Sequence, residues 1–434
     1  MTVTYDPAHP RYYDEADLRA ELNRVYDLCH GCRLCFNLCP AFPTLFQFID
    51  QHDDQDVEKL TEAEQDRVVD ECYQCKLCYV KCPYIPPHEW ELDFPRLMLR
   101  AEAVRHKNRD RAPRARLANQ FLGRIDTLGK VSSAAAPVVN RLVPQAPGSL
   151  PRRVMEKTLG VASDRLMPPF ARQRFSTWFK KRGRRTPANK HTTVALFSTC
   201  LVEYQNPAIG HDLVKVYERN GVECELPEGQ MCCGMPWLDG GDVDNFKRQA
   251  EKNVKVLARA VKEGKDIVVP QPTCAYALKK EYPGYIGDDD ARLVGEHTYD
   301  AAEYLMKLRK DGKEVDTEFT GVVPESVTYH VACHVQAQGM GLKARDLLAL
   351  TGAKVNLVSR CSGIDGTWGY RAEYSELSKA VAEPMVKGIE KHDDDVVMGD
   401  CHLANTAITE LSGKTPVHPI QLVARAYGIP EEPT

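Results

Sequence analysis

The sequence predicts a helical N-terminal domain followed by an α/β domain that is built twice, with a basic segment between them. Three observations lead to this fold class. Of the 16 cysteines, eight lie in the first 82 residues in two runs of identical spacing, and eight are spread over the last 235 residues. The segment between the two runs is polar and helix-forming, whereas short apolar strands alternate with amphipathic helices after residue 190. The net charge changes sign near residues 95 and 190.

The composition is that of a globular protein with more than one core. The chain has 434 residues, 57 Lys and Arg against 61 Asp and Glu, a net charge of -4 and 43% hydrophobic residues. This composition disfavours both disorder and a dedicated nucleic-acid binder. No run of 18 apolar residues occurs, and the first residues lack the apolar core of a signal peptide. We therefore expect a cytoplasmic protein, in which many cysteines indicate metal binding rather than disulfides.

The uneven distribution of charge predicts the domain boundaries. Residues 1–95 carry a net charge of -11, residues 96–190 carry +18 and residues 191–434 carry -11. We expect a helical domain over 1–95, a basic linking region over 96–190, and two α/β repeats over 191–320 and 321–434. Prolines interrupt the middle region, so short helices laid over a surface are expected there.

Two copies of one cysteine motif define the N-terminal domain. Both read C-x2-C-x2-C-x3-C-P, the bacterial ferredoxin pattern for [4Fe–4S] clusters, in which the fourth Cys ligates the other cluster. The predicted ligands of the first cluster are Cys29, Cys32, Cys35 and Cys82. The predicted ligands of the second cluster are Cys72, Cys75, Cys78 and Cys39. Zinc sites are the alternative, but they rarely combine a third Cys at this spacing with C-P.

The two copies begin 43 residues apart, more than in a minimal ferredoxin. With its helical filler, this region resembles the helical ferredoxin domain of respiratory iron–sulfur subunits. His30 and His88 lie beside the runs, and we expect them to be loop residues rather than ligands.

The last region repeats one order of strands and helices, with cysteines at matching points. The cysteines of the first copy are Cys200, Cys232, Cys233 and Cys274, and the middle two belong to the sequence CCG. The matching cysteines of the second copy, at offsets of 133, 129 and 127 residues, are Cys333, Cys361 and Cys401. The key cysteines fall where strands end and helices begin. Open α/β sheets bind ligands at this edge, and helix N-termini there favour anions.

Together these motifs resemble the family of C subunits of anaerobic glycerol-3-phosphate dehydrogenase. More distantly, they resemble the cysteine-rich CCG-domain subunits of heterodisulfide reductases and of lactate and glycolate oxidation systems. Besides the ferredoxin runs, the resemblance is carried by FSTCLVEYQNPAIGHDLVKV, MCCGMP, TCAYALKKEYP, YHVACH, CSGIDGTWGYRAEY and HPIQLVARAYG. It implies an electron conduit, in which a partner flavin dehydrogenase gives electrons to iron–sulfur clusters that pass them to membrane quinone.

The chain departs from that family pattern, in which each half supplies up to five thiolates. Ser362 stands where the pattern has the second Cys of a pair, and Ala404 stands where a CxxC motif would end. The first half keeps four thiolates, so we expect one further iron–sulfur cluster there. The second half keeps three, with His334 and His402 nearby, and either a second C-terminal cluster or a degenerate copy with inert thiols fits this set. Cys224 fits no position of the pattern and is expected in the core.

The basic middle region combines positive charge with aromatic residues. Phe170, Phe175, Trp178 and Phe179 lie among arginines and lysines, a mixture typical of membrane surfaces. We expect this region to dock on anionic lipid; the alternative is that its charges only neutralise the two acidic flanks. Nucleic acid is not an expected partner. No flavin or nicotinamide site is found, since the lone G-x-G at 339–341 lacks the context of a dinucleotide fold, so FAD or NAD is expected on a partner subunit.

The sequence thus predicts an iron–sulfur electron-transfer subunit of an oxidoreductase complex, peripheral on the inner face of the cytoplasmic membrane. It would pass electrons from a flavin dehydrogenase towards quinone or a redox partner protein. One alternative is a thiol or disulfide reductase of the heterodisulfide reductase type, with Cys232 and Cys233 as the candidate redox site. Another is a scaffold with vestigial C-terminal thiols. About eight iron atoms per chain would fit the scaffold, and about twelve to sixteen would fit a working C-terminal half.

Overall fold

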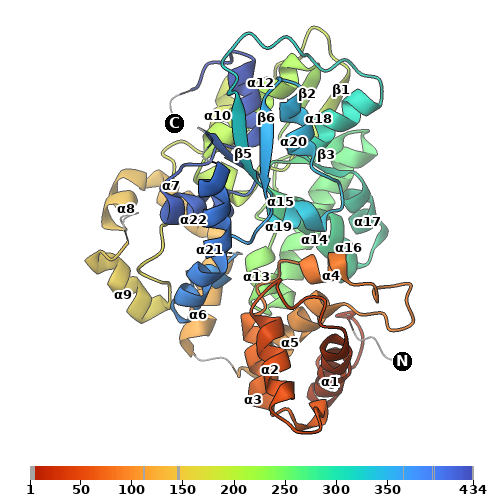
Figure 1. Ribbon diagram of the computed structural model, residues 1–434. Coiled ribbons are helices and arrows are strands. Elements are labelled where there is room, and N and C mark those ends of the chain that lie inside the picture. Colours follow the sequence, from red (N-terminus) through yellow and green to blue (C-terminus); the bar gives the residue numbers. More distant parts are fainter. Residues whose placement is uncertain are drawn as a thin grey trace.

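The computed structural model describes residues 5–110, 113–143, 147–364, 366–392, 394 and 396–432. It confirms the predicted fold class, a helical N-terminal part and two parallel α/β sheets. We call residues 5–110 the N-terminal lobe, 113–190 the middle region, 191–320 the first half and 321–432 the second half. In Figure 1 the N-terminal lobe lies beneath the two halves, and helices of the middle region lie along one flank.

The N-terminal lobe consists of helices around one apolar core. Its elements are α1 (Glu15–Cys32), α2 (Ala41–Asp50), the 3-10 turn η1 (Val57–Lys59), α3 (Glu62–Glu71), α4 (Leu77–Lys81) and α5 (Phe94–Asn108). Leu22 of α1, Phe42 of α2 and Leu97 and Val104 of α5 are buried in this core. Helix α5 runs through position 95. The lobe therefore extends beyond the change of charge at 95, because the apolar face of α5 packs on α1.

The middle region forms short helices, in keeping with its prolines. Their bounds are α6 (Pro113–Gly123), α7 (Ile125–Ala134), α8 (Ala136–Leu142), α9 (Leu150–Leu159) and α10 (Phe175–Arg182). Helix α10 is buried on one side rather than turned to a membrane. Phe175 and Trp178 are 1% and 8% exposed and pack in a core with strands of the first half. The membrane surface expected at Phe175 and Trp178 is therefore wrong, because α10 packs these two rings against α12 of the first half.

Cations next to these aromatic residues pair with acids of the first half. The ion pairs are Lys180 with Glu228, Arg182 with Glu218, and Arg184 and Lys190 with Glu223. The carboxylate of Glu223 is buried on a strand, and its hydrogen bonds with Arg184 and Lys190 lower its pKa. At this end of the middle region, the positive charge therefore neutralises an acidic flank.

Each half contains a sheet of parallel strands. The first sheet has the order β2-β1-β3-β4, formed by β1 (Thr192–Leu196), β2 (Val222–Glu225), β3 (Asp266–Val269) and β4 (Thr298–Asp300). The second has the order β6-β5-β7, formed by β5 (Ser326–His330), β6 (Lys354–Val358) and β7 (Val396–Gly399). In the second sheet, a parallel bridge joins Met398 of β7 to Val417. This bridge corresponds in position to β4, which lies beside β3 in the first sheet. The predicted duplication is thus visible in the strand order.

Helices connect and cover these strands. In the first half they are α11 (Cys200–Tyr204), α12 (Pro207–Arg219), α13 (Met235–Asp239), α14 (Val243–Lys262), α15 (Pro272–Tyr276), the π-helix η2 (Ala277–Glu281), α16 (Tyr282–Ile286), α17 (Asp289–Glu296) and α18 (Ala301–Lys310). In the second half they are α19 (Cys333–Ala337), α20 (Lys343–Ala349), the 3-10 turns η3 (Trp368–Tyr370) and η4 (Ala372–Tyr374), α21 (Ser375–His392), α22 (His402–Ser412) and α23 (Pro419–Ala426).

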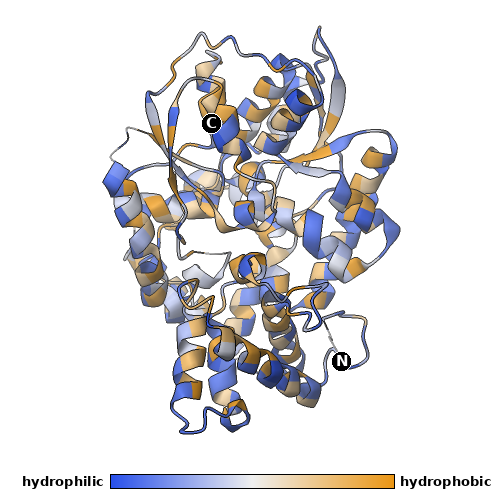
Figure 2. Ribbon diagram, turned by 45° about the vertical axis from the view of Figure 1, so that its right-hand side comes forward, coloured by the Kyte–Doolittle hydropathy of each residue, from blue (hydrophilic) through white to orange (hydrophobic). Residues whose placement is uncertain are grey.

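The two sheets share one apolar core. Val194 and Leu196 of β1 and Val327 and Tyr329 of β5 belong to the same buried cluster. Cys224 of β2 is buried in it as well, as expected from the sequence. Figure 2 shows hydrophilic and hydrophobic residues mixed along the helices, and none of the described helices is long and apolar enough to cross a membrane.

Candidate functional site

The eight N-terminal cysteines lie in two groups of neighbouring thiols. One group consists of Cys29, Cys32, Cys35 and Cys82, and the other of Cys72, Cys75, Cys78 and Cys39. In each group three thiols come from one run and the fourth comes from the other. Burial and the neighbouring thiols, Cys82 among them, raise the pKa of Cys29, and burial with neighbours that include Cys39 raises the pKa of Cys78. The structure thus brings together both predicted sets, and their ligation of iron stays a prediction.

Left-handed backbone conformations shape both loops. Arg33, with a φ of 52°, ends α1 directly after Cys32, and Gln74 and Lys76, with φ of 56° and 64°, flank Cys75. Such conformations are uncommon in residues other than Gly. They provide the tight turns that cysteines spaced by two residues require.

The thiols of the first half lie at the carboxyl ends of neighbouring strands. Cys200 begins α11 after β1, Cys274 lies in α15 after β3, and the loop with Cys232 and Cys233 follows β2. Hydrogen bonds join Cys200 to Cys232, Cys232 to Cys233 and Cys233 to Cys274. The hydrogen bond with Cys232, together with burial, raises the pKa of Cys200 well above its usual value. All four predicted thiols of this half are therefore neighbours.

Polar side chains hold the backbone of the loop that carries Cys232 and Cys233. Asn253 of α14 donates from Nδ2 to the carbonyl of Cys232 at 3.1 Å and accepts at Oδ1 from the amide of Met231 at 2.7 Å. The hydroxyl of Tyr282 donates to the carbonyl of Cys233 at 3.0 Å. Neither side chain was predicted from the sequence. The only signal was Asn253, a polar residue at a buried position of the amphipathic helix α14.

The middle region supplies one wall of a pocket beside the first-half thiols. Asp126 of α7 accepts a hydrogen bond from the amide of Cys232 at 2.8 Å and another from the hydroxyl of Tyr204 at 3.2 Å. Burial raises the pKa of Asp126. The pocket has a volume of about 380 Å³, and Lys130 and Cys200 also line it. This part of the middle region was not predicted to belong to the site, because nothing in a sequence shows which helix folds over a distant loop.

The thiols of the second half lie at its borders with the other parts. Cys361 hydrogen-bonds with Tyr73, and Cys333 belongs to the same apolar cluster as Cys75 of the N-terminal lobe. Cys401 is a neighbour of Cys274 in the first half. The second copy of the site therefore faces two other thiol groups, and a cluster in this half stays a prediction.

The two histidines near these thiols differ in whether a ring nitrogen is available as a ligand. Both ring nitrogens of His334 are engaged by hydrogen bonds, to Thr273 and to Gln74, so His334 is not a spare ligand. Burial lowers the pKa of His402 to about 4, and its Nε2 has no hydrogen-bond partner among the described residues.

The donor sets fit iron–sulfur clusters. Each of three groups offers four thiols in apolar surroundings, and four Cys thiolates are the usual ligands of a [4Fe–4S] cluster. Within the described part of the chain, no group of three or more His, Cys, Asp or Glu side chains is arranged to hold a metal ion. The thiols of each group are thus neighbours, but they are not arranged to coordinate one single metal ion.

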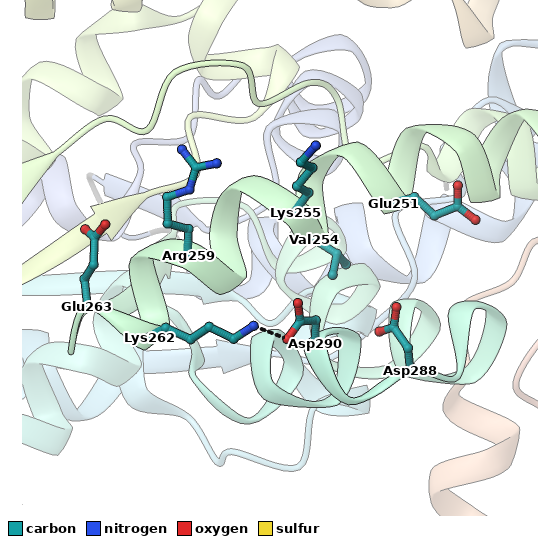
Figure 3. A pocket seen from close by; sticks show the side chains of 8 residues that line it. All are labelled: Glu251, Val254, Lys255, Arg259, Lys262, Glu263, Asp288 and Asp290. Atoms are coloured by element: carbon teal, nitrogen blue, oxygen red, sulfur yellow. Dashed lines mark ion pairs between the residues drawn. The ribbon is translucent and has the colours of Figure 1, made fainter.

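A further pocket of about 440 Å³ lies between α14 and α17. Figure 3 shows Lys262 and Asp290 pointing toward one another across it, and their ion pair measures 2.6 Å. Its lining carries both positive and negative side chains and no cysteine. This mixture does not indicate a class of ligand.

Comparisons with known proteins match these features. Residues 22–111 match the family described as the Citrate utilization protein B Fer4-like domain, and residues 194–279 and 327–407 match the Cysteine-rich domain (CCG) family. The C subunit of anaerobic glycerol-3-phosphate dehydrogenase from Escherichia coli (strain K12) is 30% identical over 316 residues, which cover 72% of this chain and 78% of that protein.

Two other relatives match over about half of the chain. Lactate utilization protein A of Bacillus pumilus is 27% identical over 220 residues, 48% of this chain and 87% of that protein. The B subunit of fumarate reductase (CoM/CoB) from Methanothermobacter marburgensis is 28% identical over 219 residues, 49% of this chain and 41% of that protein.

A Fer4-like lobe joined to two cysteine-rich halves defines an iron–sulfur subunit related to oxidoreductase subunits. Within that class, the chain belongs to the family of C subunits of anaerobic glycerol-3-phosphate dehydrogenase.

Proposed function

We propose that the chain is the electron-transfer subunit of a dehydrogenase complex, taking electrons from a flavin-containing partner and passing them towards membrane quinone or a redox partner protein. The observation that carries this proposal is the presence of two groups of four thiols in the N-terminal lobe and a third at the strand ends of the first half. When bound, iron–sulfur clusters supply one-electron chemistry. The chain's own thiols provide the ligands, and its apolar residues exclude water from them.

Exposed apolar residues beside the N-terminal thiols support docking of the partner there. Leu34, Phe36 and Val80 are 58%, 47% and 49% exposed, and all three lie within the two cysteine runs. Large apolar side chains gathered at one exposed place are typical of protein interaction sites. We therefore assign the entry of electrons to this end of the lobe.

The flank formed by the middle region is our proposed membrane surface, in place of α10. Large apolar residues on α6 to α9 are more than half exposed: Leu117, Val131, Val138, Leu142, Leu150 and Val154. Exposed cations, Lys130, Arg141 and Arg153 among them, lie on the same helices. Apolar and cationic side chains on short helices favour binding to an anionic membrane surface without crossing it.

Iron and acid-labile sulfide analysis of the anaerobically purified chain tests the proposed function. We expect about twelve iron atoms per chain, four for each group of four thiols. About eight would leave only the N-terminal clusters and contradict a working first half.

One alternative is favoured by a specific observation. The pocket beside Cys200 and Cys232 is large enough for a small molecule, so the first half could reduce a thiol or disulfide substrate there. Oxidation of the reduced protein by a quinone analogue but not by small disulfides supports electron transfer to quinone. The opposite preference supports the reductase.

A further inference from the structure

Helix α19 lies between the N-terminal lobe and the first half. It contacts α4, which carries Cys78, and α15, which carries Cys274 (Figure 1). Its second residue, His334, is 2% exposed. One short helix of the second half thus reaches both the second N-terminal thiol group and the thiols of the first half.

The ring of His334 joins these two places by hydrogen bonds. Nε2 lies 3.2 Å from the carbonyl oxygen of Gln74, and Nδ1 lies 3.0 Å from Oγ1 of Thr273. A carbonyl can only accept, so Nε2 carries the hydrogen, and Nδ1 accepts from the hydroxyl of Thr273. Gln74 is bonded to Cys75, and Thr273 is bonded to Cys274. Two hydrogen bonds and one aromatic ring therefore connect the backbone at one thiol group with the backbone at the other.

Buried contacts fix this junction in place. The ring of His334 stacks on Tyr276 with centroids 5.1 Å apart. Next to it, Nζ of Lys76 lies 3.1 Å from Oε1 of Glu281, and both side chains are 2% exposed. Glu281 ends the π-helix η2, and π-helices are rare insertions that frequently mark functional sites. The junction is thus held by a ring stack and a buried ion pair, both of which join different parts of the chain.

We propose that His334 is the residue that couples the second N-terminal thiol site electronically to the first-half thiol site, an assignment that rests on the proposed function. With clusters bound, one electron would leave the site held by Cys39, Cys72, Cys75 and Cys78, which would be oxidised. It would enter the site held by Cys200, Cys232, Cys233 and Cys274, which would be reduced. No bond forms or breaks, and both hydrogens of the bridge stay on their donors. A path through bonds and hydrogen bonds couples donor and acceptor better than an open gap of the same length.

The test compares single variants of the full-length, cluster-loaded protein. His334→Phe keeps a stacked ring but removes both hydrogen bonds, and Thr273→Val keeps the shape of the side chain but removes the hydroxyl. His211→Phe is the matched control, because His211 is also buried and stacked on an aromatic ring, Trp178, but belongs to none of the thiol sites. After mixing with dithionite, freeze-quench paramagnetic resonance follows reduction of the first-half site. Iron content and equilibrium reduction potentials are measured for every variant.

We expect reduction of the first-half site to slow by an order of magnitude in His334→Phe and Thr273→Val, with iron content and potentials unchanged. The double variant is expected to be no slower than His334→Phe, because both changes break one path. Wild-type rates in both single variants overturn the proposal while leaving the proposed function intact. Loss of iron in His334→Phe and Thr273→Val, or equal slowing in His211→Phe, gives His334 a structural role and overturns it too. About eight iron atoms in the unmodified protein, with no first-half signal, contradict the proposed function itself.

Discussion

Cys233 is one of the two inner members in the row of four first-half thiols, between Cys232 and Cys274. We expect Cys233→Ser to remove the first-half cluster, lowering the iron content by about four atoms per chain, while the N-terminal clusters still reduce normally. Iron analysis and paramagnetic resonance check both parts. Cys224→Ser is the control, because Cys224 is buried on β2 in a separate core. An equal loss of iron from the control would show that the effect comes from misfolding.

Cys361 has a different environment from Cys233. Its contacts with Tyr73 and the nearby Cys39 place it beside an N-terminal thiol group. We expect Cys361→Ser to keep the first-half signal and to lower the free energy of unfolding by about 1 to 3 kcal/mol, because a hydroxyl replaces a thiol at a partly apolar place. Urea unfolding measures the loss. Disappearance of the first-half signal in this variant would mean that the working half is assigned wrongly.

His211 provides a prediction about pH. Burial lowers its pKa from the usual 6.5 to about 4, and its ring stacks on Trp178 with centroids 4.0 Å apart. Between these two values the unfolded chain binds a proton on this histidine that the folded chain does not. The free energy of unfolding therefore falls as the pH falls from 6.5 towards 4. In His211→Phe we expect this decrease to be smaller, by up to about 3 kcal/mol.

Urea unfolding of both proteins at pH 7 and at pH 5 measures the difference. The same pH dependence in His211→Phe as in the unmodified protein would contradict the assignment.

Among the residues, the spacing of the cysteines predicts which thiols lie near one another, but not which side chains support them. The spacing of the two runs was enough to expect Cys82 with the first three cysteines and Cys39 with the second three, and the structure places them so. Asp126 was not predicted, and His334 was expected only near the second-half thiols, not in contact with the N-terminal lobe. Each acts through a loop more than 100 residues away, and a single polar residue on a helix gives no sign of its partner.

Among the elements, the helices of the middle region carry the proposal about the membrane. We expect the full-length protein to bind anionic vesicles in a salt-dependent way, because exposed charges are screened beyond about 8 Å at physiological ionic strength. Replacing Leu150 and Val154 by Ser is expected to weaken vesicle binding by about tenfold or more, since each exposed apolar side chain contributes about 1 to 2 kcal/mol when it enters the interface.

Sedimentation with vesicles measures this binding, and Val322→Ser is the control. Val322 is 79% exposed but lies outside the middle region. Equal binding to neutral and anionic vesicles would argue against the electrostatic part of the mechanism. Replacing Lys180, Arg182 and Arg184 by Gln is not a clean test, because these residues form ion pairs within the fold.

The elements also show where composition misleads. Alternating strands and helices were predictable after residue 190 because parallel strands buried on both faces are short apolar runs. Helix α10 was wrongly assigned to the membrane surface. A mixture of aromatic and basic residues fits a membrane surface, but it also fits a buried core surrounded by ion pairs. Burial of Phe175 and Trp178 depends on α12, which the local sequence does not reveal.

In the whole molecule, the buried pair of Lys76 and Glu281 joins the N-terminal lobe to the first half. Burial alone would lower the pKa of Lys76, but Glu281, Tyr276 and Asp239 together outweigh burial and raise that pKa. Lys76→Met leaves Glu281 buried without its partner, so we expect a loss of about 3 to 5 kcal/mol in the free energy of unfolding. The double variant Lys76→Met with Glu281→Met is expected to lose less.

A double-mutant cycle by urea unfolding measures this coupling. Lys387→Met serves as the matched control, because its ion pair with Glu383 is exposed and should contribute little. Additive losses in the Lys76 and Glu281 cycle would show that the pair does not hold the two parts together.

The junction at His334 has a consequence for biosynthesis. Gln74 and His334 are 260 residues apart in the chain, and ribosomes add about 5 to 20 residues per second, so roughly 13 to 50 s pass between their synthesis. During that interval the second cysteine run has been made, while His334, whose ring later hydrogen-bonds to Gln74 of that run, has not. In the nascent chain this cysteine run therefore lacks the contact with α19 that it has in the complete protein. That contact forms only once the second half has been synthesised, so the order of synthesis sets when this side of the cysteine run becomes buried.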